Sequence, residues 1–240
     1  MTGVQTCALP ICAQLYATAR GAYEARINGK RVGDQYLAPG YTDFNESILY
    51  QAYDVTDMLT RGSNAIGFSV GDGWYSGVNA AMLKPYGAQP SVMAMLRIVY
   101  EDGSVENIIT DDTWRYSPDS PILESNLIHG ENYDANREPA LEGWSTAGFN
   151  ESTWAEPGIA ERPEAAVRGN QDAAITVVDE IAPISRNVDV NGNIVFDFGQ
   201  NLVGNVRVAV SGAPGSTMEL HYGEARSEEH TSELQSRVSI

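Results

Sequence analysis

Apolar and polar residues alternate with a period of two through most of the chain, which is the pattern of half-buried β-strands. The alternation runs through residues 23–27, 48–52, 66–70, 92–100, 105–109, 175–178, 194–198, 206–210 and 218–222. No segment shows the apolar period of an amphipathic helix of about twelve or more residues. Short strands separated by Gly-rich turns predict an all-β protein built as a sandwich or a barrel.

Turn residues separate the predicted strands. Asn28-Gly29 follows the first alternating run and predicts a tight hairpin turn. Asp102-Gly103 ends the longest run and predicts a second turn. Residues 54–59 predict one short helical turn, with Asp54 or Thr56 as the capping residue.

A change in composition after residue 154 divides the chain. Residues 13–154 predict one β-sandwich, whereas residues 155–172 are polar, rich in Pro and Ala, and without alternation. That segment is interpreted as a linker or as chain that crosses the surface between two units. Residues 173–225 resume the strand pattern, but a β unit of about 50 residues rarely buries enough surface to be stable alone. We therefore interpret it as the truncated start of a second β domain.

The two ends, residues 1–12 and 226–240, are predicted to be tails that do not belong to the natural protein. Codons that encode residues 226–236 also encode residues 2–11 when read on the opposite strand in another frame. Translated sequencing adapter at both ends of a gene fragment explains this relation, and it indicates a metagenomic bacterial source. The alternative is a real tail with chance complementarity. Tails of this origin are expected to be disordered or arbitrarily placed, so that deleting them changes the melting temperature of the 13–154 sandwich by no more than about 1–2 °C.

Composition narrows the classes of partner. The 240 residues carry a net charge of −17, which argues against nucleic acid, because phosphates require Lys and Arg, and against an anionic membrane surface. No run of ~18 apolar residues predicts a transmembrane helix. Both cysteines, Cys7 and Cys12, lie in the first tail, so cysteine usage indicates no redox compartment. Periplasmic, extracellular and cytoplasmic locations all remain open.

Residues that carry out chemistry are sparse. His129 and His221 are far apart and lack metal-ligand spacing, so neither is expected to bind a transition metal. The chain has no phosphate-binding loop and no nucleophile elbow. Carboxylates are numerous, but a glycosidase pair is defined by its separation in space. The sequence therefore nominates no catalytic residue.

The densest candidate for binding is the loop Gly71–Gly77, which places Asp72, Trp74 and Tyr75 directly after a predicted strand. Sugars stack their apolar faces on aromatic rings, while carboxylates and amides bind their hydroxyls. The loop combines both kinds of group. The alternative is that Trp74 seals the sandwich core and that the glycines serve a β-bulge.

Two further segments mix oxygen ligands with aromatic residues. Residues 41–45 contain Asp43 and Asn45, and residues 129–136 contain Glu131. Both segments would suit a sugar, and Asp43 and Asn45 are candidate calcium ligands, because calcium takes carboxylate and carbonyl oxygens. Solvated loops with turn-forming Asp and Asn are the commoner explanation of such segments.

Taken in order, several segments resemble the non-catalytic N-terminal part of bacterial α-L-rhamnosidases. They are residues 17–34, 37–44, 50–56, 71–75, 130–135 and 149–154. Residues 196–204 resemble the start of the concanavalin-like domain that follows in that family. The resemblance covers 13–225 and implies a jelly-roll-like β-sandwich followed by the truncated start of a concanavalin-like β-sandwich.

The resemblance implies a parent enzyme that hydrolyses terminal α-L-rhamnosyl linkages with inversion. In the family the catalytic acid and base lie on a later (α/α) barrel, so this fragment is expected to be inactive alone. In some relatives the first sandwich binds L-rhamnose with calcium, which makes an L-rhamnose-containing glycan and the downstream barrel the expected partners. The sugar-binding candidates, chosen on their chemistry, are Asp43, Asn45, Asp72, Trp74, Tyr75 and Glu131.

Three functions stay open at this point. The chain is an accessory sugar-binding region of a rhamnosidase, a structural brace of that enzyme, or a carbohydrate-binding or adhesion module of an unrelated surface protein. A titration with L-rhamnose, with and without calcium, separates the first two.

Overall fold

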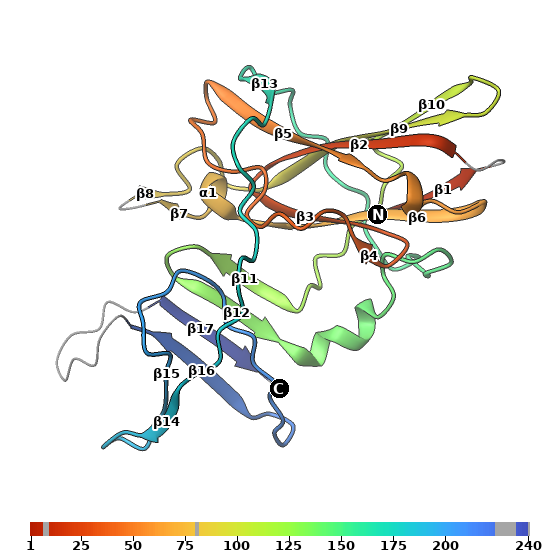
Figure 1. Ribbon diagram of the computed structural model, residues 1–240. Helices are drawn as coiled ribbons and strands as arrows, with labels where there is room; N and C mark the ends of the chain where they lie inside the picture. Colours follow the sequence, from red (N-terminus) through yellow and green to blue (C-terminus); the bar gives the residue numbers. More distant parts are fainter. Residues whose placement is uncertain (7–9, 80–81, 224–233, 240) are drawn as a thin grey trace.

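The computed structural model describes residues 1–6, 10–79, 82–223 and 234–239, and the regular secondary structure in them is almost entirely β (Figure 1). Two sheets form the larger part, in the orders β1-β6-β3-β4 and β10-β9-β2-β5-β13. Their strands are β1 (Thr2–Thr6), β2 (Pro10–Arg20), β3 (Ala22–Ile27), β4 (Lys30–Arg31), β5 (Ser47–Asp54), β6 (Gly62–Gly71), β9 (Ser91–Tyr100), β10 (Val105–Ile109) and β13 (Ala166–Gly169). The predicted β-sandwich is confirmed.

Alternating side chains of the two sheets meet in one core. Leu15 of β2 and Leu96 and Ile98 of β9 face Ile27 of β3 and Ile66 of β6, and all of them are fully buried. Each such side chain contributes roughly 1.5–3 kcal/mol when it leaves water. The period-two pattern of the sequence thus corresponds directly to the inner faces of the sandwich.

The predicted turn at Asn28-Gly29 is confirmed and has a second role. Both residues have positive φ angles, 49° and 80°, as this tight hairpin turn requires. The Asn28 amide Nδ2 donates to Asn64 Oδ1 at 2.8 Å and to the Met58 carbonyl at 2.9 Å. The turn therefore anchors the neighbouring loop as well as reversing the chain.

The predicted helical turn at 54–59 is the short 3₁₀ helix η1 (Thr56–Met58). Asp54 Oδ1 accepts hydrogen bonds from the Thr56 hydroxyl at 2.7 Å and the Thr56 amide at 3.0 Å. These bonds lower the pKa of the Asp54 carboxyl. The N-cap position itself is held by Val55, whose side chain makes no capping bond.

The segment 155–172, predicted to lack strands, contains β13. This strand lies parallel to β5 at the edge of the second sheet, with Val167 opposite Ile48. The Ala166 amide donates to the Glu46 carbonyl at 3.0 Å, and the Asn170 amide donates to the Tyr50 carbonyl at 2.9 Å. Edge pairing of this kind uses only backbone groups, so alternation was not needed to form it.

The remaining strands form smaller sheets: β7 and β8 lie at one end of the sandwich beside α1, and the others lie below the sandwich in Figure 1. They are β7 (Val78–Asn79), β8 (Met82–Leu83), β11 (Ile122–Asn126), β12 (Gly130–Asp134), β14 (Ser185–Val188), β15 (Ile194–Asp197), β16 (Thr217–Tyr222) and β17 (Leu234–Ser239). The two other helical elements are α1 (Gly73–Ser76) and the 3₁₀ helix η2 (Ala135–Leu141). In the part of the chain that the structure describes, no helix is long and apolar enough to span a membrane.

Beyond residue 173 the structure confirms two predicted strands and contradicts two others. The alternating runs at 194–198 and 218–222 form β15 and β16, whereas 175–178 and 206–210 adopt no strand. Apolar residues in this region lie in solvent, with Val178 96% and Val190 101% exposed. An alternating run forms a stable strand only against a covering layer and a paired neighbour, and no described residue supplies them here.

The expectation that residues 1–12 are disordered or arbitrarily placed is wrong for the residues described. Strand β1 pairs antiparallel with β6, and residues 10–12 begin β2. Val4 is only 4% exposed, and the Met1 ammonium donates to the Arg115 carbonyl at 2.8 Å. Strand addition at a sheet edge requires backbone groups and alternating side chains, which an unselected sequence can also supply. In the second tail, residues 234–239 form β17, and residues 226–233 and 240 lie outside the described residues.

Substitution at Val4 tests whether β1 is part of the folded sandwich. Val4→Ala should lower the free energy of unfolding by about 2 kcal/mol, because it removes two buried methyl groups and leaves a cavity. Gln5→Ala, at an exposed position on the same strand, is the control and should change it by less than about 0.5 kcal/mol. Urea titrations followed by fluorescence measure both values, and equal midpoints for the two variants would contradict the packing of β1.

Candidate functional site

Three loops bring their aromatic side chains together beside the sandwich. Phe44 lies 5.4 Å from Tyr75 and 5.2 Å from Tyr86, measured between ring centroids. Phe44 is 5% exposed and forms a small core of its own, against which Trp74 also packs. Tyr41, Phe44, Trp74, Tyr75 and Tyr86 are called the aromatic cluster below. The cluster joins two of the segments that the sequence singled out, 41–45 and 71–77.

The loop Gly71–Gly77 folds as the single helical turn α1, which lies beside β7 and β8 in Figure 1. Gly73 has a φ of 52°, and a Cβ at this position would lie 2.7 Å from the backbone of Gly21 and Ala22. The glycine therefore lets this loop approach the start of β3, rather than opening space for a ligand. Asp72 closes the turn, because its Oδ1 accepts the Ser76 hydroxyl at 3.1 Å.

Trp74 is half-buried, which fits neither a core residue nor a free surface platform. Its ring lies 6.0 Å from the ring of Tyr41 at 54°. Tyr41 is 54% exposed, so the Tyr41 and Trp74 rings form the accessible edge of the aromatic cluster. Sequence analysis did not nominate Tyr41, although it is the first residue of the 41–45 segment.

Tyr75 belongs to the interior of the cluster. Its ring stacks on Tyr86 at 6.2 Å, and the Arg20 guanidinium lies 5.9 Å from its centroid. Both contacts occupy ring surface that a sugar would need. Of the two aromatic candidates in this loop, Trp74 is therefore better placed to meet a ligand.

Hydrogen bonding fixes the hydroxyl groups at this edge. The Tyr41 and Tyr86 hydroxyls lie 3.5 Å apart. The hydrogen bond with Tyr41, together with desolvation, raises the pKa of Tyr86 to about 12, and hydrogen bonds from Tyr86 and Asn79 lower the pKa of Tyr41. At neutral pH the Tyr86 phenol stays protonated and holds its neighbour in place.

Asp43 and Asn45 are exposed on the loop that carries Phe44. Asp43 Oδ1 accepts a hydrogen bond from the Asn45 amide at 3.0 Å, and the Asp43 carbonyl accepts from Glu46 at 3.0 Å and from Ser47 at 2.9 Å. This is the local geometry of a turn-forming Asp. One oxygen of the Asp43 carboxylate is left for another partner.

Asp43 and Asn45, the candidate calcium ligands, offer carboxylate and amide oxygens at this loop. Calcium requires six to eight oxygen ligands, usually with more than one carboxylate among them. Within the described ranges, no group of three or more His, Cys, Asp or Glu side chains is close enough to hold a metal ion. Calcium also takes amide and backbone carbonyl oxygens, so the calcium role of Asp43 and Asn45 stays a prediction.

Glu131 lies on a neighbouring hairpin. It is opposite Ser125 in the pairing of β11 with β12, and a Cβ at Gly71 would lie 3.3 Å from the Ser125 hydroxyl. The hairpin thus reaches the start of the loop Gly71–Gly77. Partial desolvation raises the pKa of the Glu131 carboxyl. Glu131 thus lies on a hairpin that adjoins the loop of Asp72, Trp74 and Tyr75.

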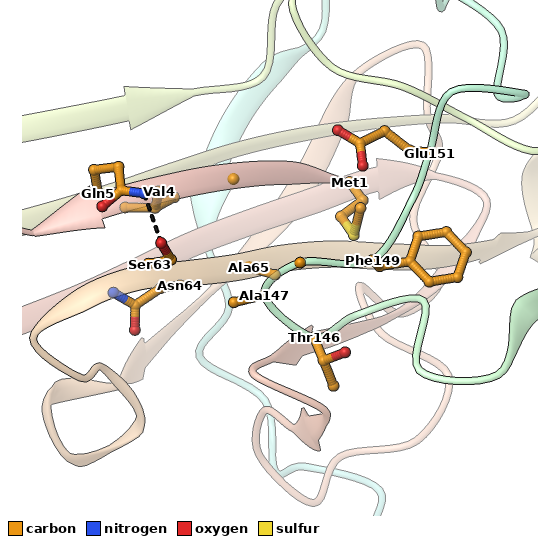
Figure 2. Close-up of a pocket in the computed structure, with 12 residues that line it drawn as sticks. Met1, Val4, Gln5, Ser63, Asn64, Ala65, Thr146, Ala147, Phe149 and Glu151 are labelled. Carbon is orange, nitrogen blue, oxygen red and sulfur yellow. Dashed lines mark hydrogen bonds between the residues drawn. The ribbon is translucent and has the colours of Figure 1, made fainter.

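Two hollows accompany these features. One, of about 210 Å³, lies between β1, β6 and residues 146–151, and Figure 2 shows Met1, Phe149 and Glu151 around it. It contains none of the predicted site residues, and part of its wall is the predicted tail. The other, of about 160 Å³, lies between residues 35–41 and 170–175, and Tyr41 forms part of its wall. This second hollow therefore adjoins the aromatic cluster.

The half-buried position of Trp74 predicts an intermediate effect on stability. Trp74→Ala should lower the free energy of unfolding by about 1–2 kcal/mol, since part of its ring already contacts water. Phe44→Ala, which empties the centre of the cluster, should cost about 3–5 kcal/mol. Chemical denaturation of both variants measures the two values, and an equal or larger loss for Trp74→Ala would place Trp74 in the core.

Comparison with known proteins gives consistent matches. Residues 10–179 match the family model of the α-L-rhamnosidase N-terminal domain, and residues 189–237 match that of the bacterial α-L-rhamnosidase concanavalin-like domain. The chain is 41% identical to an α-L-rhamnosidase of Streptomyces avermitilis over 216 residues, which is 88% of this chain and 20% of that protein. It is 33% identical to one of Formosa agariphila, over 91% of this chain and 24% of that protein.

Solved structures agree in fold. The S. avermitilis α-L-rhamnosidase complexed with L-rhamnose aligns with a TM-score of 0.93 and 33% identity, over 100% of this chain and 24% of that chain. The native enzyme of Aspergillus terreus aligns with a TM-score of 0.93 and 33% identity, over 100% of this chain and 28% of that chain. The present chain thus spans about a fifth to a quarter of the length of the curated relatives.

Proposed function

Because this chain belongs to the α-L-rhamnosidase family, as its N-terminal and concanavalin-like regions, we propose that it is the accessory β-sandwich region of an α-L-rhamnosidase and binds L-rhamnose. The observation that carries the proposal is the exposed edge formed by Tyr41 and Trp74 beside Asp43. The relative from S. avermitilis was solved with L-rhamnose, which supports a sugar as the ligand class. Family membership contradicts the interpretation as a module of an unrelated surface protein.

The aromatic edge and its polar neighbours divide the work of binding. The Trp74 and Tyr41 rings offer flat apolar surface at low cost in side-chain entropy, and a pyranose ring stacks on such surface. The sugar hydroxyls bind to the polar groups around these rings. These groups are the second carboxylate oxygen of Asp43, the side-chain amide of Asn45 and the tyrosine hydroxyls. Asp72 holds the turn in shape through Ser76, and Glu131, on the hairpin that reaches the start of this loop, is included as a further polar candidate. A shallow site of this kind gives millimolar affinity, which corresponds to about 4 kcal/mol.

We assign catalysis to the part of the polypeptide outside this chain. An inverting glycosidase requires two carboxyl groups about 6.5–9.5 Å apart on either side of the scissile bond. The catalytic (α/α) barrel is proposed to lie in the remaining length that the relatives possess. We divide the present chain into the sandwich, extended to β13, and the incomplete concanavalin-like domain that follows, with tails at both ends.

A bracing role is the second candidate. It is favoured by the apolar residues between 175 and 210 that lie in solvent, among them Val178 and Val203. Such residues are normally covered in a complete protein. Bracing and sugar binding use different residues, so one chain can do both. Bracing stands alone only if the aromatic edge binds no ligand.

Titration of the chain with L-rhamnose tests the proposed binding. The wild type should show saturable binding in the millimolar range, and Trp74→Ala should abolish it by removing the stacking surface. Trp154→Ala is a matched control, because Trp154 is also half-buried but packs against Trp144 and Phe149, so binding should persist. A chelator tests the predicted calcium role: loss of rhamnose affinity on chelation would indicate that Asp43 and Asn45 act through calcium, and unchanged affinity would indicate direct contact with the sugar.

Two results would contradict this proposal. No rhamnose-dependent signal in the wild type at millimolar sugar would leave the bracing role alone. Equal loss of binding in Trp74→Ala and Trp154→Ala would show that binding is lost through general destabilisation of the fold, and not through removal of this edge.

Hydrolysis is the complementary measurement. The purified chain should release no product above background from an aryl α-L-rhamnoside, because the acid and base lie elsewhere in the polypeptide. Turnover that a single carboxylate substitution within residues 13–225 removes would overturn the assignment of catalysis to the missing part.

A further inference from the structure

The hollow of about 160 Å³ beside the aromatic cluster has walls of two chemical kinds. Leu37 and Leu49 provide apolar surface, and Tyr36 and Tyr41 provide rings. Asn170 and Asp172, which follow β13, provide polar groups. In Figure 1 this region is found where β5 and β13 lie next to each other at the top of the sandwich.

The first wall is held in place by the sandwich core. The Ala38 carbonyl accepts a hydrogen bond from the Tyr23 backbone N–H at 2.9 Å. The Pro39 carbonyl accepts one from the buried Gln51 side chain, through Nε2, at 3.0 Å. The Arg31 guanidinium stacks 4.3 Å from the centre of the Tyr36 ring and donates to the Gln35 carbonyl at 2.7 Å.

The second wall is tied to the first. The Tyr36 amide donates to the Ile175 carbonyl at 2.8 Å, and the Asn170 amide donates to the Tyr50 carbonyl at 2.9 Å. Both sides of the hollow are therefore fixed by backbone hydrogen bonds before any ligand arrives. A preformed site loses little free energy to ordering when it binds.

The polar groups indicate a neutral ligand that carries hydroxyls. Asn170 Oδ1 accepts the Asp172 amide at 2.9 Å, which orients the rest of the amide group. Among the described residues, the side chains of Gln35 and Asp172 have no hydrogen-bond partner, so they are available to a ligand. The Asp172 carboxylate would repel an anionic ligand. The Arg31 guanidinium does not offset this repulsion, because it is already paired with Glu24. A hydroxylated ring with one apolar face meets these conditions, and the hollow is smaller than the roughly 300–1,000 Å³ of drug-sized sites.

Tyr41 connects this hollow to the proposed rhamnose site. Tyr41 lines the hollow, and its ring contacts Trp74. We propose that the hollow is a second subsite that binds the adjoining sugar ring of a rhamnosyl oligosaccharide, with Tyr41 between the two rings. This inference rests on the proposed function, because it extends the same binding surface by one sugar residue.

The test compares a monosaccharide with a disaccharide on the full chain. L-Rhamnose and an α-L-rhamnosyl-glucose disaccharide are titrated against the wild type, Ala173→Trp and Ala174→Trp. Ala173 lines the hollow and Ala174 does not, and both are exposed, so the two substitutions differ in whether they fill the subsite. Asn170→Ala is a second variant that removes a polar contact without adding bulk.

The wild type should bind the disaccharide about tenfold more tightly than rhamnose, the gain expected from one further modest contact surface. Ala173→Trp should remove this gain and leave rhamnose affinity unchanged, Asn170→Ala should reduce the gain, and Ala174→Trp should behave as the wild type.

Equal affinities for the two sugars in the wild type would overturn the second subsite while leaving the rhamnose site intact. A gain that survives both Ala173→Trp and Asn170→Ala would also overturn it. Absence of binding by either sugar would contradict the proposed function and the subsite together.

Discussion

The burial of alternating apolar side chains between the two sheets is the interaction on which the rest of the structure depends. Strand β2 lies between β9 and β5 in one sheet and faces β3 and β6 of the other. Because the inner faces are closely packed, the ends of these strands have fixed positions, and so do the loops that leave them. The aromatic cluster and the hollow beside it are built from such loops.

A buried network of hydrogen bonds connects the core to a loop at the surface. The Tyr23 hydroxyl lies 2.8 Å from Gln51 Oε1 and 3.1 Å from the Ala17 carbonyl. Burial raises the pKa of Tyr23, so the phenol stays neutral and hydrogen-bonded. Gln51 in turn donates to the Pro39 carbonyl. The loop between the proposed rhamnose-binding edge and the proposed second subsite is therefore held by hydrogen bonds to the core.

The two parts of the chain differ in how far the apolar side chains of their strands are buried. In the sandwich, apolar positions are covered by the opposite sheet. After β13, residues with the same alternation remain in solvent, which is consistent with a domain that other parts of a longer polypeptide complete. One packed sandwich and one open domain are compatible with the proposed accessory role: the sandwich carries the proposed sugar-binding edge, and the exposed apolar residues after β13 are available for contact with other parts of a longer polypeptide.

The sequence by itself determined the all-β class, most strands of the sandwich and the hairpin turn at Asn28-Gly29, because period-two alternation and turn residues act locally. Its ordered motifs also indicated the family. Tertiary structure alone decided that β1 and β13 join sheet edges, since edge pairing forms through backbone groups and no local pattern shows which edge is open to them. It also decided the roles within the candidate site. Whether Trp74, Tyr75 or Tyr41 faces solvent depends on which rings pack against Phe44, and those contacts join residues that are about thirty to forty positions apart.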